Sequence, residues 1–227
     1  MPHKIRLAGR QPLASGSARD VYLHPDDPDL LIKVIRKAAI EERYGKGRPW
    51  YKRTRRYRHF ISYLREIREE IALQAQCVTH PSSLQKIVGF ADTDLGFGLV
   101  VEAAKDRDGK LAPTLPQLIE TGRFTPQVRA HLADCLDELI TSPVVLADVH
   151  GDNLVYAWDA ANGDHFVLID GIGCKTFIPL HRMSTRINGY AKRKRAAKVL
   201  MKADRANAAK IERAATPASA SRLHAAE

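Results

Sequence analysis

Asp148-Val149-His150-Gly151-Asp152-Asn153 is the stretch of sequence that decides the fold. Its spacing makes the chain double back, so that Asp148 and Asn153 converge from opposite ends of a tight turn. Downstream, the apolar run Phe166-Val167-Leu168-Ile169 is rich in β-branched residues and predicts a buried strand that delivers Asp170-Gly171 to a loop. Asp, Asn and Gly also fill ordinary turns, and the alternative is therefore a pair of turns without chemistry.

This spacing resembles the catalytic loop and metal-binding aspartate of protein-kinase-like folds. The resemblance implies that Asp148 orients the acceptor hydroxyl, that Asn153 and Asp170 bind Mg²⁺, and that His150 contacts the nucleotide. A second register takes His150-Gly151-Asp152 as the histidine-glycine-aspartate of antibiotic phosphotransferases. That register fails because its asparagine would fall on Ala157.

The segment from Pro12 to Tyr22 resembles the glycine-rich loop that folds over the phosphates of ATP. Only Gly16 matches a consensus glycine, and Ala14 and Arg19 occupy the other two positions, which stiffens the loop. The resemblance assigns the nucleotide contacts of this loop to Gly16, Ser17 and Val21, with Val21 covering the adenine.

Lys33 lies inside the apolar run 30–35, where a lysine is costly unless its ammonium group finds an anion. It resembles the third-strand kinase lysine, which holds the α- and β-phosphates and pairs with a helix glutamate. Apolar residues at three-to-four-residue intervals predict that helix over residues 57–76. Three glutamates on it are candidates for the pairing, and we favour Glu69 over Glu66 and Glu70.

The run from Gly96 to Glu102 predicts a strand that enters a polar segment, as the fifth kinase strand enters the hinge. The resemblance implies that backbone groups from Glu102 to Ala104 hold adenine. Two helices are expected next, over 114–119 and 126–140, and the second leads to Asp148.

The order of these elements predicts an α+β, two-lobed protein-kinase-like fold. Little chain follows Asp170, so we expect a compact C-terminal lobe without a peptide-docking platform. We divide the chain into a nucleotide-binding part over 1–104 with a basic insert at about 43–58, a compact lobe over 105–190, and a basic helical extension with a flexible tail over 191–227.

More closely, the chain resembles the YrbL family of bacterial kinase-like proteins, called PhoP regulatory network proteins. The resemblance spans most of the chain, and its most specific stretch runs from Asp170 to Leu180. The other stretches that carry it are Pro12 to Gly16, His24 to Asp27, Leu31 to Val34, Asp108 to Lys110 and Val149 to Leu154.

Composition is consistent with one domain of two lobes, because 227 residues with 44% hydrophobic content suffice for a sizeable core. No run approaches the length of a membrane span, and the start lacks a secretory signal, which predicts a cytoplasmic protein. Cys77, Cys135 and Cys174 are too few and too widely spaced for a disulfide framework or a zinc site. Cys174 is either redox-sensitive or a small buried hydrophobe.

The formal net charge of +10 is concentrated in two stretches. One covers 43–58, with eight lysines and arginines, no acids and interleaved aromatics, and the other covers 192–213 in an alanine-rich helical segment. Both predict acidic partners such as nucleic acid, a phospholipid surface or an acidic protein. A solvated helix face and a mobile insert are the alternative.

Three functions follow from these features. The first is an ATP- and Mg²⁺-dependent phosphotransferase of unknown acceptor, because Lys33, Asp148, Asn153 and Asp170 are all present. The second is a kinase-fold regulatory or binding module that no longer transfers phosphate, since Leu146-Ala147 replaces the usual histidine-arginine pair. The third is a nucleic-acid-binding protein that uses the basic stretches.

Overall fold

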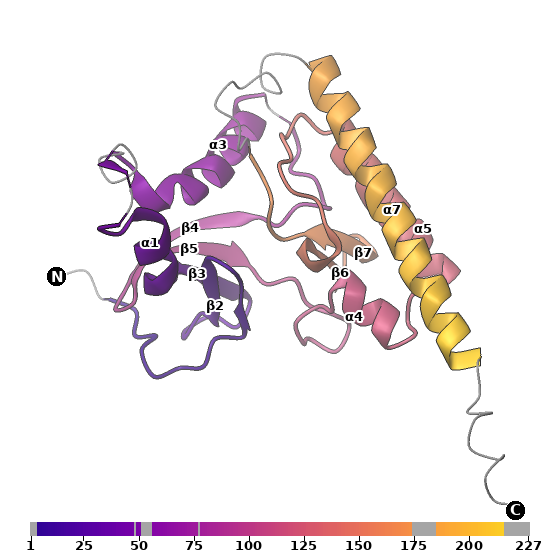
Figure 1. The fold of residues 1–227 in the computed structure, drawn as a ribbon, viewed down its shortest axis with the longest axis horizontal. Coiled ribbons are helices and arrows are strands. Elements are labelled where there is room, and N and C mark those ends of the chain that lie inside the picture. Colours follow the sequence, from indigo (N-terminus) through magenta and orange to yellow (C-terminus); the bar gives the residue numbers. More distant parts are fainter. Residues whose placement is uncertain (1–3, 48, 51–55, 77, 174–184, 216–227) are drawn as a thin grey trace, which may run out of the picture.

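The computed structural model of the chain has two lobes, a sheet-based N-terminal lobe and a mainly helical C-terminal lobe (Figure 1). It describes residues 4–47, 49–50, 56–76, 78–173 and 185–215. The predicted α+β class is confirmed, and the two lobes meet around the β6–β7 hairpin and the segment that follows β5.

A five-stranded antiparallel sheet forms the N-terminal lobe, in the strand order β1-β2-β3-β5-β4. The predicted strands over 30–35 and 96–102 are confirmed with the same bounds. In order along the chain, the strands are β1 (Ala14–Ser15), β2 (Arg19–Leu23), β3 (Leu30–Ile35), β4 (Ile87–Thr93) and β5 (Gly96–Glu102). Lys33 lies in the centre of the sheet, opposite Val21 of β2 and Leu99 of β5.

One long helix, α3 (Ile61–Ala75), lies against this sheet, preceded by the short helices α1 (Lys37–Tyr44) and η1 (Arg58–Phe60). Tyr63 fixes it there, because its hydroxyl is buried and donates a hydrogen bond of 2.7 Å to the backbone carbonyl of Lys33. The helix predicted over 57–76 is therefore confirmed, with a short 3₁₀ turn at its start.

In the described residues, the C-terminal lobe contains three α-helices and one hairpin. They are α4 (Leu115–Glu120), α5 (Pro126–Thr141), the hairpin strands β6 (Leu154–Asp159) and β7 (Gly163–Leu168), and α7 (Thr185–Ala215), with the 3₁₀ turn η2 (Gly151–Asn153) before β6. Helices α4 and α5 start where the sequence provides caps, since the side chains of Thr114 and Thr125 accept hydrogen bonds from backbone amides of the first turns. The two predicted helices are confirmed to within one residue at each end.

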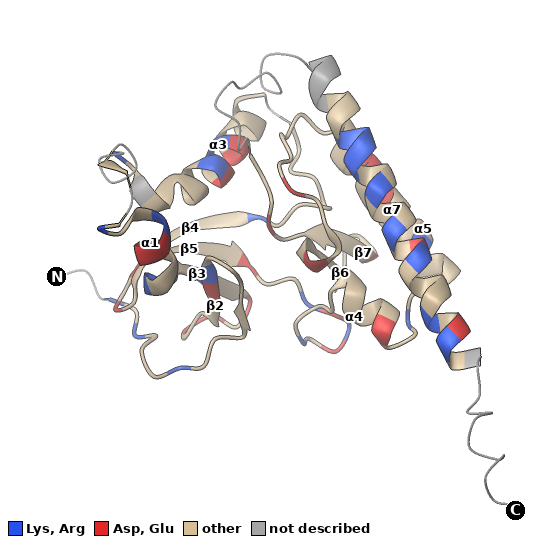
Figure 2. Cartoon of the chain, in the orientation of Figure 1, with Lys and Arg blue, Asp and Glu red and all other residues tan. Residues whose placement is uncertain are grey.

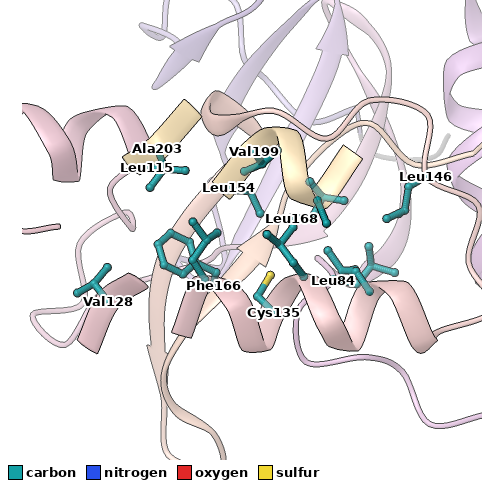
Figure 3. Close-up of a cluster of buried hydrophobic side chains, with 14 of the residues drawn as sticks. Leu84, Leu115, Val128, Cys135, Leu146, Leu154, Phe166, Leu168, Val199 and Ala203 are labelled. Carbon is teal, nitrogen blue, oxygen red and sulfur yellow. The ribbon is translucent and has the colours of Figure 1, made fainter. Parts of the chain in front are cut away.

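The main hydrophobic core lies between α5, the hairpin and α7 (Figure 3). Leu132, Phe166 and Leu168 are fully buried at its centre, and Ala196, Val199 and Ala203 of α7 pack against them. The small alanine side chains let α7 approach closely. The core therefore includes a helix that the sequence indicated only as an extension.

Lys192 anchors α7. Its side chain is only 1% exposed, which is unusual for a lysine. Its Nζ donates to the backbone carbonyls of Leu139 and Ser142, at 2.8 and 2.6 Å, and so caps the C-terminus of α5. The predicted boundary at residue 190 falls inside α7, and the part of 191–227 that the structure describes belongs to the C-terminal lobe. Lysines and arginines mark most turns of this helix (Figure 2).

No helix in the described part of the chain is both long enough and apolar enough to cross a membrane.

Candidate functional site

A cavity of about 660 Å³ is lined by residues of both lobes. The residues predicted for the site that line it are Gly16, Ser17, Val21, Lys33, Asp148, His150, Asn153 and Asp170. The sequence places these side chains up to 154 positions apart, between Gly16 and Asp170. The fold therefore brings together in one cleft the predicted phosphate-binding loop, the lysine, and the four polar residues of the predicted catalytic loop (148–153) and metal loop (170–171).

Backbone hydrogen bonds hold the catalytic loop against the metal loop. The carbonyl of Gly171 accepts from the amides of Ala147 and Asp148, at 2.8 and 3.0 Å, and Leu146 forms a bridge with Ile172. Gly171 has φ of 88°, and a Cβ there would lie 2.0 Å from the Asp148 carbonyl oxygen. Only glycine fits at this close approach. The backbone contacts here take the place of the histidine that supports the metal loop in kinases, which this sequence lacks.

Asn153 is held by the same framework. Its backbone carbonyl accepts from the amide of Ile169 at 2.9 Å, and its side-chain amide donates to the carbonyl of Asp148 at 3.4 Å. Because Ile169 directly precedes Asp170, these contacts fix the two predicted metal ligands relative to each other.

Lys33 is buried in the cleft, with 6% of its surface exposed. Its Nζ donates to the Oε1 atom of Gln85 at 2.6 Å and to the carbonyl of Ile169 at 2.5 Å. Burial lowers the pKa of Lys33 to about 8, although the negative charge of Glu66 acts in the opposite direction. Lys33 is therefore mostly protonated at neutral pH and loses its proton in mildly alkaline solution.

The structure does not pair Lys33 with Glu69, the glutamate that we favoured. Glu69 accepts a hydrogen bond from the amide of Val145 at 2.9 Å, and it lies outside the cleft cavity. Glu66, which was the alternative, lines the cleft with Lys33. The two glutamates lie on neighbouring faces of α3, and the position of the C-terminal lobe decides which of them enters the cleft.

Arg19 occupies the position between the glutamate and the metal loop. Its guanidinium group contacts Glu66 at 2.6 Å and Asp170 at 2.5 Å. Among the residues that the structure describes, no carboxylate forms an ion pair with Lys33. Arg19 thus takes both of the acidic groups closest to the lysine, and it connects the N-terminal lobe to the metal loop.

The charges and the hydrogen bond around Asp170 favour its ionised form. Burial acts to raise its pKa, but the charges of Arg19 and Lys33 and a hydrogen bond of 2.6 Å from the Gly171 amide lower the pKa below its ordinary value. Its side chain is still 45% exposed toward the cleft. A carboxylate that is ionised and accessible is suited to a hard cation.

The predicted adenine-binding segment is partly engaged by the chain itself. The carbonyl of Glu102 accepts from the side-chain amide of Gln85 at 2.8 Å, and the carbonyl of Ala104 accepts from the amide of Ala112 at 2.9 Å. Neither residue lines the cleft cavity. Each carbonyl retains a second lone pair, and the assignment of adenine to this segment stays a prediction.

The donor set at the metal loop fits Mg²⁺. Asp170 offers a carboxylate and Asn153 offers an amide oxygen, and Mg²⁺ is commonly bound by one or two such groups together with waters and phosphate oxygens. Within the described residues, no cluster of three or more histidine, cysteine or acidic side chains is placed to hold a metal. A Mg²⁺ ion at this loop would take its other ligands from waters and phosphate oxygens.

Sequence reasoning missed Arg19, which lines the cleft, and Gln85, which contacts Lys33 from outside the cavity. Gln85 gave no signal, since it lies in no motif, and Arg19 was identified only as a departure from the glycine pattern. Other predictions lie wholly or partly outside the described residues, namely those on Cys77, Cys174, the tail from 216 and much of the basic insert. Cys135 is buried, and burial raises its thiol pKa to about 12.

The antiparallel sheet with its lysine strand and packed helix, together with the paired catalytic and metal loops, defines a protein of the kinase-like class. The chain belongs to the family described as PhoP regulatory network protein YrbL, whose model matches residues 5–204.

Two curated relatives are similar over 180 residues at 27% identity, covering 78% of this chain and 77% of theirs. They are the uncharacterized YrbL proteins of Escherichia coli K12 and Shigella flexneri. Among solved structures, a crystal structure of Rad53 in complex with AMP-PNP matches 85% of this chain and 46% of its own, with 11% identity and a TM-score of 0.44. The assignment to the kinase-like class rests on the strand order and the cleft. The match to Rad53 contributes nothing to it.

Proposed function

We propose that the protein is an ATP- and Mg²⁺-dependent phosphotransferase. The observation that carries the proposal is that Lys33, Asp148, Asn153 and Asp170 line one cleft between the lobes. In this arrangement, Lys33 binds the phosphates, and Gly16, Ser17 and Val21 cover the nucleotide from the N-terminal lobe.

The residues divide the chemistry between them. The Asp148 carboxylate orients the acceptor hydroxyl and takes its proton, while the acceptor oxygen bonds to the γ-phosphorus and the bond to the ADP oxygen breaks. Asn153 and Asp170 would hold Mg²⁺. Bound there, the ion neutralises charge on the transferring phosphoryl group. Gly171 keeps Asp148 and Asp170 in register through its backbone contacts with the catalytic loop.

Arg19 affects the binding of a metal at this site. Its ion pair with Asp170 uses one of the oxygens that the metal requires, so metal binding competes with the guanidinium group. Glu66 provides Arg19 with a second carboxylate, on which it remains when Asp170 is released. The competition favours occupation of the metal site only when a nucleotide contributes further ligands.

The same ion pair favours one second candidate, a kinase-fold regulatory module that binds nucleotide without transferring phosphate. Arg19 bridges Glu66 and Asp170 without a metal, so this contact between the lobes does not depend on one. The family description connects its members with the PhoP regulatory network, and either activity would serve as the output of such a network.

ATP turnover in which water is the acceptor tests the proposal. We expect Asp148→Asn to lower the turnover at least about 100-fold, because general-base catalysis contributes a factor of this order. Asp152→Asn is the matched variant in the same loop, whose side chain is 77% exposed, and we expect a much smaller loss. A larger loss in Asp152→Asn would instead support the register that starts at His150, and equal turnover in all three proteins would contradict a role for Asp148.

A further inference from the structure

A second cavity, of about 850 Å³, lies on the other side of the catalytic loop (defined here as the α7 cavity). It is formed by α4, by the catalytic loop and by one face of α7. Asp148, His150 and Asp152 line both this cavity and the nucleotide cleft. The carboxylate of the predicted base therefore lies in the wall that the two cavities share.

One stripe of α7 faces this cavity. Its members recur every three or four residues, at Arg195, Lys198, Lys202, Ala206, Ala209 and Arg213. The neighbouring stripe, with Ala196, Val199 and Ala203, is buried in the core and fixes the rotation of the helix. The basic side chains are therefore held toward the cavity by the packing of the helix, and Figure 2 shows the lysines and arginines along α7.

The charge of the α7 cavity is not balanced from within. Five basic side chains line it, from Arg195, Lys198, Lys202, Lys210 and Arg213, against three acidic ones, from Glu120, Asp148 and Asp152. In the described part of the chain, the ion pairs recorded for α7 involve none of the five, and Lys210 donates to the backbone carbonyl of Glu120. With no carboxylate partner for these cations among the residues that the structure describes, a positive potential lies over the cavity.

The floor of the α7 cavity is apolar. Leu115 and Ile119 of α4 and Val199 and Ala203 of α7 line it, and each is less than 10% exposed. A molecule that fits here combines an apolar or ring-shaped body with anionic groups at its edge.

We propose that the α7 cavity binds the phosphate acceptor, and that this acceptor is an anionic small molecule with a free hydroxyl group. The proposal rests on the phosphotransferase function above. The hydroxyl oxygen of the acceptor attacks the γ-phosphorus of ATP across the shared wall, its proton passes to Asp148, and the products are ADP and a phosphate ester of the acceptor. Arg195, Lys198 and Lys202 hold the anionic groups and orient the hydroxyl toward Asp148.

Calorimetric titration of inorganic pyrophosphate, without ATP or Mg²⁺, tests the binding step. We expect that replacing Arg195, Lys198 and Lys202 with alanine together weakens pyrophosphate binding at least tenfold. The matched control replaces Arg193, Lys194 and Arg205, which are exposed on α7 and line no part of the cavity, and we expect less than a twofold change. Lys198→Ala alone provides a milder variant if the triple replacement lowers the thermal unfolding midpoint.

Three results overturn the proposal. Wild-type protein that binds no pyrophosphate at millimolar concentration has no anion site, and equal weakening by both triple replacements assigns the binding to general surface charge, as for a nucleic acid. Loss of binding in Lys33→Met alone places the anion in the nucleotide cleft. None of these results depends on ATP, so a failure here is distinguishable from a failure of the phosphotransferase proposal.

Turnover assays then test the acceptor. Pairs of alcohols, such as glucose and glucose 6-phosphate, differ only by an anionic group, and we expect transfer to the charged members. The Arg195, Lys198 and Lys202 replacement should lower kcat/KM for the charged acceptor at least tenfold and change the KM for ATP less than twofold. Transfer to neutral acceptors at rates that this replacement leaves unchanged contradicts the proposal.

Discussion

The nucleotide cleft and the α7 cavity share the catalytic loop but treat charge in opposite ways. In the cleft, Arg19 joins Glu66 to Asp170, and Lys33 is bound by Gln85 and the Ile169 carbonyl. In the α7 cavity, Arg195, Lys198 and Lys202 face an apolar floor without carboxylate partners among the described residues. Lys33 and Arg19 of the cleft already have partners within the protein, whereas the α7 cavity is lined by more basic than acidic side chains.

The difference indicates which ligand each site selects. A ligand of the cleft has to exchange existing contacts, and under the proposed function a nucleotide with its own Mg²⁺ would do so, with the ion in place of Arg19 on Asp170. A ligand of the α7 cavity displaces only water and mobile counterions. Affinity in the cleft should therefore depend on metal and on pH, and affinity in the α7 cavity should depend on salt.

The largest effect is expected at Gly171, which lines the cleft and contacts Asp148, a residue that the two regions share. Gly171→Ala forces a Cβ against the Asp148 carbonyl at a positive φ, and we expect a loss of at least about 1 to 3 kcal/mol in the free energy of unfolding, with loss of ATP binding. Gly163→Ala is the control, since Gly163 has φ of 67° but no atom within 4 Å of the added Cβ. Chemical denaturation of both variants measures the difference, and equal losses would show that the close approach to Asp148 is unimportant.

The α7 cavity should be lost separately through Lys192. Lys192→Met leaves the carbonyls of Leu139 and Ser142 without their buried donor, and we expect a cost of about 1 to 3 kcal/mol together with weaker pyrophosphate binding. Lys194→Met, on the exposed side of the same helix, should change stability by less than about 0.5 kcal/mol. If both variants unfold at the same denaturant concentration, Lys192 does not anchor the helix.

The pH dependence of ATP binding should come from Lys33. Its pKa of about 8 in the free protein lies below the ordinary lysine value, so Lys33 is half charged at about pH 8 and almost fully charged at neutral pH. Because phosphate binding requires the charged form, ATP affinity should change little up to about pH 7 and then fall as the pH rises through about 8, approaching about tenfold per pH unit above that value. Fluorescence titration between pH 6.5 and 9.5 measures it. Lys33→Met should bind weakly and without this pH dependence, and a parallel decrease in that variant would assign the titration to another group.

The smallest effect is expected at Arg19. Arg19→Gln removes the cation that competes for Asp170, and we expect the Mg²⁺ concentration for half-maximal ATP binding to fall about three- to fivefold. Titration of Mg²⁺ at fixed ATP measures the change. An increase would mean that Arg19 supports nucleotide binding directly instead of competing with the metal.

Local patterns predicted the elements of the fold well. The strands that carry Lys33 and precede the hinge, and the helix of α3, depend on apolar periodicity within one segment, and they lie where the sequence indicated. Spacing within a tight loop predicted that Asp148 and Asn153 lie close together. Only the resemblance predicted that Asp170, far along the chain, lies in the same cleft.

Contacts between distant segments could not be predicted in this way. Glu66 and Glu69 differ by three positions on one helix, and the packing of α3 against the sheet puts Glu66 beside Arg19, while the placement of the second lobe puts Glu69 beside Val145. Gln85 became a partner of Lys33 through the packing of a loop. The docking of α7 depends on alanines and a buried lysine, which in sequence are typical of a solvated basic helix.

The central claim is that the cleft binds ATP through a metal held at Asp170. Thermal unfolding with ATP, with and without Mg²⁺, tests it most directly on the wild type and on Asp170→Ala. We predict that Mg²⁺ and ATP together stabilise the wild type by about 2.7 kcal/mol at a hundredfold excess over the dissociation constant, and that Asp170→Ala loses this increment. Stabilisation of neither protein, or equal stabilisation of both whether or not Mg²⁺ is present, would contradict the account.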